Sequence, residues 1–196
     1  MLTKTQKRMK RIFDLALVLV LIPVLVLPIF ILFLIASIST QRNGFFVQKR
    51  VGQYGKLFCC YKLRSLKGEN HLDVNAMKAS ETAFGKWLRR SKLDELPQLF
   101  NVLKGDMSFV GPRPDLPGYA DTLENDDKII LSIKPGITGP ATLKYKNEDA
   151  LLLKQSNPQD YNDRVIWPDK AAINKEYIKN WSIRKDCTFL FASVIR

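Results

Sequence analysis

The chain has 196 residues, a length consistent with one domain and a segment that enters a membrane. Its formal net charge of +12 and pI near 9.7 indicate an anionic partner: nucleic acid, anionic lipid or a phosphorylated substrate. Three cysteines, two of them adjacent, provide no disulfide framework and fit a reducing, cytosolic setting. The single histidine, His71, gives poor support to histidine-based metal sites and to Ser-His or Cys-His catalysis.

A basic N-terminus precedes a long apolar segment. Residues 1–14 carry five Lys and Arg side chains and no acid before Asp14, and residues 15–36 form an unbroken apolar run. As a helix this run would be about 33 Å long, which is enough to cross the hydrocarbon core of a bilayer. It is too long for the core of a signal peptide. The segment therefore predicts membrane association, and it favours lipid and phosphate over nucleic acid as the anionic partner.

Two prolines interrupt the apolar run, and both of its flanks are basic. Pro23 and Pro28 each remove a backbone hydrogen bond and kink a helix. A simple crossing would place one basic flank outside the cell, against the positive-inside tendency. A kinked helix that enters one leaflet and returns would leave both flanks in the cytoplasm. We therefore predict a re-entrant helix with its hinge at Pro23 and Pro28, although a full crossing stays open.

Two further elements are predicted before the middle of the chain. Residues 45–63 read as two short strands around a turn at residues 52–55. Residues 67–82 are polar without a clear period and predict a loop. A helical pattern then begins at Phe84 and ends at residues 89–91, Arg-Arg-Ser.

The densest chemical signal lies between residues 92 and 114. Apolar side chains recur there at helical spacing: Leu96, Leu99, Phe100 and Leu103. Asp94 stands at the N-cap position of this predicted helix, Pro97 in its first turn and Gly105 at its end. Asp94 and Glu95 would lie at the positive end of the helix, where an ionised carboxylate can attack phosphorus or hold a divalent cation. On spacing alone, ordinary capping is the favoured interpretation of both residues.

A loop with the sequence Gly-Pro-Arg-Pro follows at residues 111–114. Its two prolines stiffen the backbone, and the guanidinium of Arg113 has the shape that forks onto phosphate oxygens. Taken alone, an arginine between prolines is more often a solvated loop residue.

These strings resemble the signature of the bacterial sugar transferases that act on polyprenyl phosphate, the monotopic phosphoglycosyl transferases. The matching strings are Leu-Asp-Glu-Leu-Pro-Gln-Leu at 93–99, Gly-Asp-Met-Ser-Phe-Val-Gly-Pro-Arg-Pro at 105–114, Lys-Pro-Gly-Ile-Thr-Gly at 134–139 and Gln-x-Arg-x-Gly-x-x-Gly at 48–55. The resemblance covers nearly the whole chain. It departs at the hinge, because the family carries a Ser-Pro pair there and this chain has Ile22 before Pro23 and Leu27 before Pro28.

The resemblance implies an enzyme that transfers a phospho-sugar from a UDP-sugar to undecaprenyl or another polyprenyl phosphate, with release of UMP. This reaction would be the first membrane step of a bacterial glycan pathway, on the cytoplasmic face of the inner membrane. The resemblance also implies that Asp94 is the nucleophile, which forms a covalent phospho-sugar intermediate, and that Glu95 holds Mg²⁺ beside it. The residues expected to bind substrate phosphates are Lys62, Arg64, Arg89 and Arg113.

We expect an α+β fold that is mainly α, with a short β-hairpin and a small helical core. A basic N-terminus and re-entrant membrane helix would occupy residues 1–42, and a membrane-apposed cytoplasmic catalytic domain residues 43–196. Residues 119–133 predict a helix with a solvated acidic patch. Apolar and basic side chains in residues 184–196 predict an amphipathic segment that lies on the membrane surface.

A non-catalytic membrane module is the competing hypothesis. Such a protein would bind anionic lipid or recruit glycan-assembly enzymes, and its acidic pair would only cap a helix. A cap tolerates Asn in place of Asp94, whereas a nucleophile does not. The sequence leaves open which sugar is moved, which glycan is built and whether the chain forms a homo-oligomer. Nucleic acid is not an expected partner.

Overall fold

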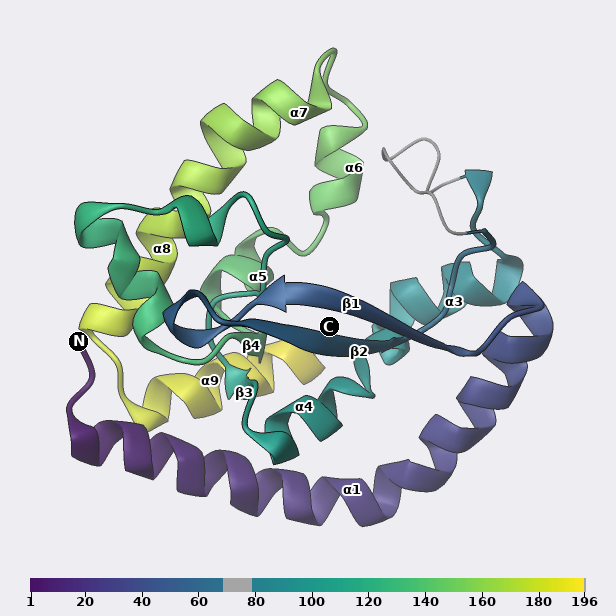
Figure 1. Ribbon diagram of the computed structural model, residues 1–196, viewed down its shortest axis with the longest axis horizontal. Coiled ribbons are helices and arrows are strands. Elements are labelled where there is room, and N and C mark those ends of the chain that lie inside the picture. The colour runs from purple at the N-terminus through teal and green to yellow at the C-terminus, as the bar shows by residue number, and fades with distance from the viewer. Residues whose placement is uncertain (69–78, 196) are drawn as a thin grey trace. The chain divides into compact units, whose positions relative to one another are not determined.

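The computed structural model of the chain (Figure 1) describes residues 1–68 and 79–195, so His71, Arg196 and most of the loop predicted at 67–82 lie outside the described residues. The chain forms two compact units. The first unit contains residues 1–14, 49–58 and 105–196, and the second contains residues 15–48 and 59–104. Helices dominate, and the strands are short, which confirms the predicted α+β, mainly α class.

Helix α1 (Lys4–Thr40) is long and apolar enough to cross a membrane by its length and composition, which fits the predicted membrane association. Pro23 and Pro28 lie inside it. Neither proline has an N–H, so each leaves one carbonyl of the preceding turn without its usual helical donor. Figure 1 shows that the helix bends in its C-terminal half. Large apolar side chains along α1 are exposed, among them Val24 at 67% and Leu27 at 63%.

A tight turn joins the C-terminal end of α1 to strand β1 (Phe45–Val51). Ser37 Oγ donates a hydrogen bond to the Phe33 carbonyl at 2.8 Å and accepts one from Gly44 N at 2.9 Å. The rings of Phe33 and Phe45 stack with centroids 4.7 Å apart. A Cβ atom at Gly44 would lie 2.2 Å from the Phe33 carbonyl oxygen, so this close approach requires glycine.

The predicted hairpin is present. Strands β1 and β2 (Leu57–Leu63) form a two-stranded sheet, and a 3₁₀ turn, η1 (Gln53–Gly55), connects them. The backbone of Gly52 donates to the carbonyl of Lys56 at 2.9 Å and closes the turn.

The second unit continues with α3 (Ala83–Ser91), which ends where the sequence predicts. The Thr82 hydroxyl caps this helix by accepting a hydrogen bond from Gly85 N at 2.8 Å. A 3₁₀ turn, η2 (Leu93–Glu95), and helix α4 (Gln98–Lys104) follow.

The prediction that Asp94 caps a single helix is wrong. Asp94 lies inside η2, whose cap position is Lys92 in a left-handed conformation (φ +59°), and α4 begins only at Gln98. The break follows from Pro97, which has no N–H to donate to the carbonyl one turn before it. The end of α4 agrees with the prediction, since Gly105 adopts φ +93° directly after Lys104.

The first unit contains a parallel pair of strands, β3 (Ser108–Val110) and β4 (Gly136–Thr138), with Ser108 opposite Gly136. Two 3₁₀ helices, η3 (Ala120–Thr122) and η4 (Asn125–Ser132), lie in the connection between the strands. They replace the helix predicted at 119–133. The left-handed backbone of Asn125 (φ +48°) interrupts the helical geometry there.

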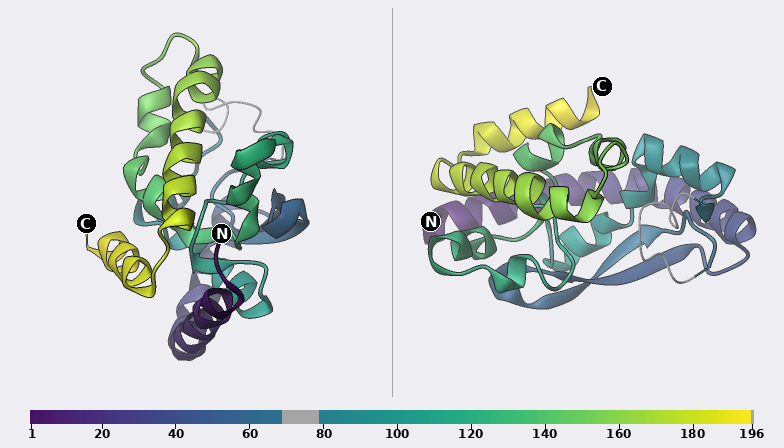
Figure 2. Two further views of the ribbon diagram at one scale, coloured as in Figure 1. Left: turned by 90° about the vertical axis from the view of Figure 1, so that its left-hand side faces the viewer. Right: turned by 90° about the horizontal axis from the view of Figure 1, so that it is seen from above.

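Helices complete this unit: α5 (Pro140–Lys144), α6 (Glu148–Leu152), α7 (Pro158–Tyr161), a π-helical turn η5 (Asn162–Ile166), α8 (Trp167–Lys179) and α9 (Ile183–Val194). Figure 2 shows α8 and α9 as consecutive helices joined by a short turn. Helix α5 contacts both of them, and α9 also contacts β3 and β4. Near its end α9 exposes apolar side chains, as predicted for an amphipathic segment: Phe191, Val194 and the following Ile195.

A buried polar network ties the first turns of α1 to the last two helices. Asp186 of α9 is fully buried. It accepts hydrogen bonds from three side chains: Lys10 Nζ at 2.6 Å, Tyr177 OH at 2.6 Å and Trp181 Nε1 at 3.1 Å. Burial and the negative charge of Asp186 raise the pKa of Tyr177 above its ordinary value, so the phenol keeps its proton and donates.

A variant with Asp186→Leu should therefore lose about 3–5 kcal/mol of unfolding free energy, because Lys10 would stay buried without its counter-charge. Chemical denaturation in detergent micelles would measure the loss. The matched control is Asp160→Leu, which breaks an ion pair with Arg164 whose side chains are 49% and 79% exposed. That control should cost at most about 1 kcal/mol. Equal losses in the two variants would contradict the importance of the buried network.

Candidate active site

Asp94 and Glu95 lie side by side in η2, and both are buried, with 8% and 7% of their surface exposed. Lys62, near the end of β2, places its ammonium group 3.1 Å from Glu95 Oε1. Two adjacent carboxylates that are largely removed from water need a cation close by, because charge is costly to bury alone. The structure thus brings one predicted phosphate-binding residue, Lys62, to the predicted carboxylate pair.

Asp94 Oδ1 is buried and accepts no hydrogen bond from the residues that the structure describes.

Asn101 joins α4 to strand β2. Its side chain is fully buried. Nδ2 donates to the Cys59 carbonyl at 2.7 Å, and Oδ1 accepts from the Tyr61 backbone N–H at 3.0 Å. The sequence analysis did not single out this residue. The sequence does contain a signal, because Asn101 is a polar residue within an apolar stretch. In the structure its neighbours Leu99 and Val102 are also buried.

Arg64, also expected to bind phosphate, bonds to the start of β1. Its Nε donates to the Asn43 carbonyl at 2.8 Å, and its Nη2 lies 3.5 Å from the Phe45 carbonyl. The guanidinium also lies over the ring of Phe46, 5.5 Å from the centroid. These contacts fasten the two ends of the hairpin together, and the phosphate-binding role of Arg64 stays a prediction.

Arg89, on the last turn of α3, forms an ion pair with Glu81, with Nε 3.5 Å from Oε1. Glu81 lies just before α3 and was not anticipated as a partner. The phosphate-binding role of Arg89 likewise stays a prediction.

Arg113 belongs to the first unit, in the loop after β3. This loop is hydrogen-bonded to the turn at residues 134–139: Gly111 N donates to the Thr138 carbonyl at 2.9 Å, and Gly136 N donates to the Pro112 carbonyl at 2.8 Å. A Cβ atom at Gly136 would lie 2.1 Å from Gly111 N, so the two backbones approach this closely only with glycine. Two strings that are far apart in the sequence thus form one rigid loop pair.

Asp115 follows this loop, and the sequence analysis missed it. Its carbonyl accepts a hydrogen bond from Val51 N at 2.9 Å. Burial raises the pKa of the Asp115 carboxyl to about 6, although the positive charges of Lys170, Arg50 and Arg113 act in the opposite direction. The Asp115 carboxyl therefore lies near three positively charged side chains of the same unit.

No group of three His, Cys, Asp or Glu side chains that could hold a metal ion occurs within residues 1–68 and 79–195. Mg²⁺ does not require one, because it commonly binds one or two carboxylates and completes its shell with water and substrate phosphates. The carboxylate oxygens of Glu95 are hard ligands of the kind that Mg²⁺ prefers, so this residue fits the predicted role.

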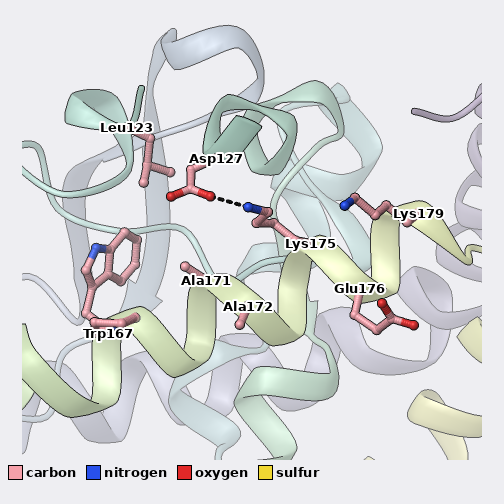
Figure 3. Close-up of a pocket in the computed structure, with 9 residues that line it drawn as sticks. Leu123, Asp127, Trp167, Ala171, Ala172, Lys175, Glu176 and Lys179 are labelled. Carbon is pink, nitrogen blue, oxygen red and sulfur yellow. Dashed lines mark hydrogen bonds and ion pairs between the residues drawn. The ribbon is translucent and has the colours of Figure 1, made fainter. Parts of the chain in front are cut away.

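A pocket of about 390 Å³ lies between η4 and α8 in the first unit (Figure 3). Trp167 stands at one end, and an ion pair between Asp127 and Lys175, 2.5 Å long, bounds it on one side. The predicted site residues are not among those that line it.

Comparison with known proteins gives a consistent family. The model of the bacterial sugar transferase family matches residues 5–196. The "uncharacterized sugar transferase EpsL" of Bacillus subtilis is 34% identical over 95% of this chain and 85% of its own length. A "putative undecaprenyl-phosphate N-acetylgalactosaminyl 1-phosphate transferase" of the same organism is 40% identical over 60% of this chain and 68% of its own length.

The "undecaprenyl-phosphate galactose phosphotransferase" of Salmonella typhimurium is 35% identical over 73% of this chain. That match covers 31% of the Salmonella protein, so this chain spans about a third of that relative's length.

The Asp115 carboxyl predicts a pH dependence of stability. Its pKa in the folded protein, about 6, lies above the ordinary value of 3.8, so the folded state binds the proton more tightly than the unfolded chain. This contribution to stability is present at low pH and is lost as the pH rises through 6. Between pH 5 and pH 7.5, ionisation of Asp115 should lower the unfolding free energy by about 1 kcal/mol. The Asp115→Asn variant should lack this part of the pH dependence. Denaturation at both pH values would measure it, and identical slopes in the two proteins would contradict it.

Proposed function

We propose that this chain, which belongs to the bacterial sugar transferase family, transfers a phospho-sugar from a UDP-sugar to polyprenyl phosphate at a membrane surface. The observation that carries the proposal is the buried Asp94–Glu95 pair with Lys62 at 3.1 Å from Glu95, in a string that matches the family signature. The names of the Salmonella and Bacillus relatives support undecaprenyl phosphate as the lipid acceptor. The chain would act on the cytoplasmic face of the inner membrane.

In the proposed reaction Asp94 is the nucleophile. One of its carboxylate oxygens attacks the β-phosphorus of the UDP-sugar. A bond forms from aspartate to phosphorus, the bond from that phosphorus to the bridging oxygen breaks, and UMP leaves with the electron pair. A phosphate oxygen of the polyprenyl phosphate then attacks the same phosphorus and releases the Asp94 carboxylate. Splitting one displacement into two in this way is ordinary covalent catalysis.

Both substrates are anionic, so the site has to supply positive charge. Glu95 would hold Mg²⁺, which when bound offsets the phosphate charge and stabilises the departing UMP. Lys62 lies beside Glu95, and we propose that its ammonium group contacts a substrate phosphate there. Arg64, Arg89 and Arg113 are proposed to contribute further phosphate contacts.

The proposed topology is re-entrant. Residues on both sides of the apolar run meet in the first unit: Lys7 Nζ donates to the Tyr54 hydroxyl at 3.1 Å and lies over its ring, 5.5 Å from the centroid. A chain that returns to its starting unit leaves both flanks on one side of the membrane. The bend of α1 in its C-terminal half and the two prolines inside this helix support the same topology.

Activity measurements would test the proposed reaction. The purified protein in detergent, with undecaprenyl phosphate and Mg²⁺, should release UMP from at least one of a panel of UDP-sugars. Asp94→Asn should reduce the rate by about four orders of magnitude or more, because the amide is a far weaker nucleophile. Removal of Mg²⁺ with a chelator should also abolish release.

The competing non-catalytic module makes the opposite prediction. It would release no UMP from any donor, and Asp94→Asn would leave its folding and its binding to anionic vesicles unchanged. Equal UMP release by wild type and Asp94→Asn would remove Asp94 as the nucleophile.

Cysteine labelling would test the topology. The natural cysteines, of which Cys59 and Cys187 are exposed, would first be replaced by serine. Single cysteines in place of Thr5 and Arg42 should then react with a membrane-impermeant reagent from the same face, in inside-out vesicles and not in intact cells. Labelling of the two positions from opposite faces would establish a full crossing and exclude the re-entrant helix.

A further inference from the structure

Asn101 contacts strand β2 in the way that a neighbouring strand would. The Cys59 carbonyl and the Tyr61 N–H are two residues apart, so they point to the same edge of the strand. The side-chain amide of Asn101 combines an N–H donor and a carbonyl acceptor, and with one of each it satisfies both backbone groups, at 2.7 Å and 3.0 Å. Among side chains of this size only asparagine supplies this pair. Aspartate has two acceptors when ionised, and leucine has neither.

This contact lies close in the sequence to both members of the Lys62–Glu95 pair. Lys62 directly follows Tyr61, the residue that Asn101 binds, and Glu95 precedes Asn101 by six residues, across the buried Pro97. A second contact supports the same arrangement, because Lys104 Nζ lies 3.4 Å from the Tyr61 hydroxyl. Asn101 therefore fixes α4, the helix that follows the turn with Glu95, to the backbone of the strand that carries Lys62.

We propose that Asn101 is a positioning residue for the carboxylate site, which holds Glu95 in register with Lys62 on β2. The proposal rests on the proposed function for its consequence in catalysis, but its geometry does not depend on it. Asn101 itself is fully buried, so we assign it no contact with substrate. It acts by holding α4, directly after the turn with Glu95, against the strand that carries Lys62, the partner of Glu95 at 3.1 Å.

Lysine acetylation resolved by mass spectrometry would test this register directly. Lys62 is 20% exposed and paired with Glu95, so it should react slowly in the wild type. In Asn101→Ala the two hydrogen bonds are lost, and Lys62 should react at least about fivefold faster, the factor expected for one hydrogen bond. The internal control is Lys170, which is 17% exposed and paired with Glu148 at 2.6 Å. Its rate should not change.

A matched variant separates positioning from general stability. Asn174 of α8 is also a buried asparagine, and its Oδ1 accepts no hydrogen bond from the described residues. Asn174→Ala should leave the Lys62 rate at the wild-type value, whatever it does to the melting temperature. If Asn101→Ala does not fold, Asn101→Asp keeps the volume and the acceptor for Tyr61 N while removing the donor to Cys59, and Lys62 should again react faster.

The kinetics of UMP release should also change in the Asn101 variants. In an Asn101 variant, the kcat of UMP release should fall by up to about a hundredfold, as expected for a displacement on the order of 1 Å at a catalytic group. The KM for the UDP-sugar should change little, because Asn101 makes no substrate contact. An unchanged Lys62 acetylation rate in both Asn101 variants would overturn the positioning role. Failure of the proposed function is a separate result, since it would appear as no UMP release from any donor or as UMP release that does not depend on Asp94.

Discussion

The first unit depends on one fully buried carboxylate. Asp186 of α9 compensates the charge of Lys10 and also accepts from Tyr177 and Trp181, so a helix from each end of the chain meets at this residue. Exposing the charge of Lys10 or of Asp186 to lipid, or burying either one alone, would cost a large amount of free energy. The start of the membrane helix is therefore fixed in the same unit as α8 and α9, a few residues before its apolar run begins.

The second unit also contains a fully buried polar side chain that joins two elements, but this side chain is uncharged. Asn101 is as fully buried as Asp186, but it pairs with backbone groups instead of a charge. Buried polar groups tolerate few alternative arrangements, because any displacement leaves a donor or an acceptor unsatisfied. Apolar packing alone would permit small sliding of α4 against β2. A reaction that needs Glu95 and Lys62 within contact distance benefits from the stricter constraint.

Local patterns in the sequence predicted the local elements well. The apolar run, the hairpin around residues 52–55 and the end of α3 all follow from periodicity and turn residues. The break before α4 could have been anticipated from Pro97, but the helical spacing of the leucines concealed it. Periodicity does not specify which strand a helix meets, so it did not predict partners that are separated in the sequence. The Lys62–Glu95 pair, 33 residues apart, was expected at one site only through the family resemblance. The Asn101–Tyr61 contact, 40 residues apart, was not expected.

The Lys10–Asp186 bond also constrains the order of events during synthesis. Its two residues are 176 positions apart, nearly the whole length of the chain. The N-terminal helix leaves the ribosome first, and its apolar run is available to the membrane long before α9 exists. Until then Lys10 has no Asp186 to bind. Closure of the first unit therefore has to wait for the synthesis of α9, and contacts of such long range form slowly.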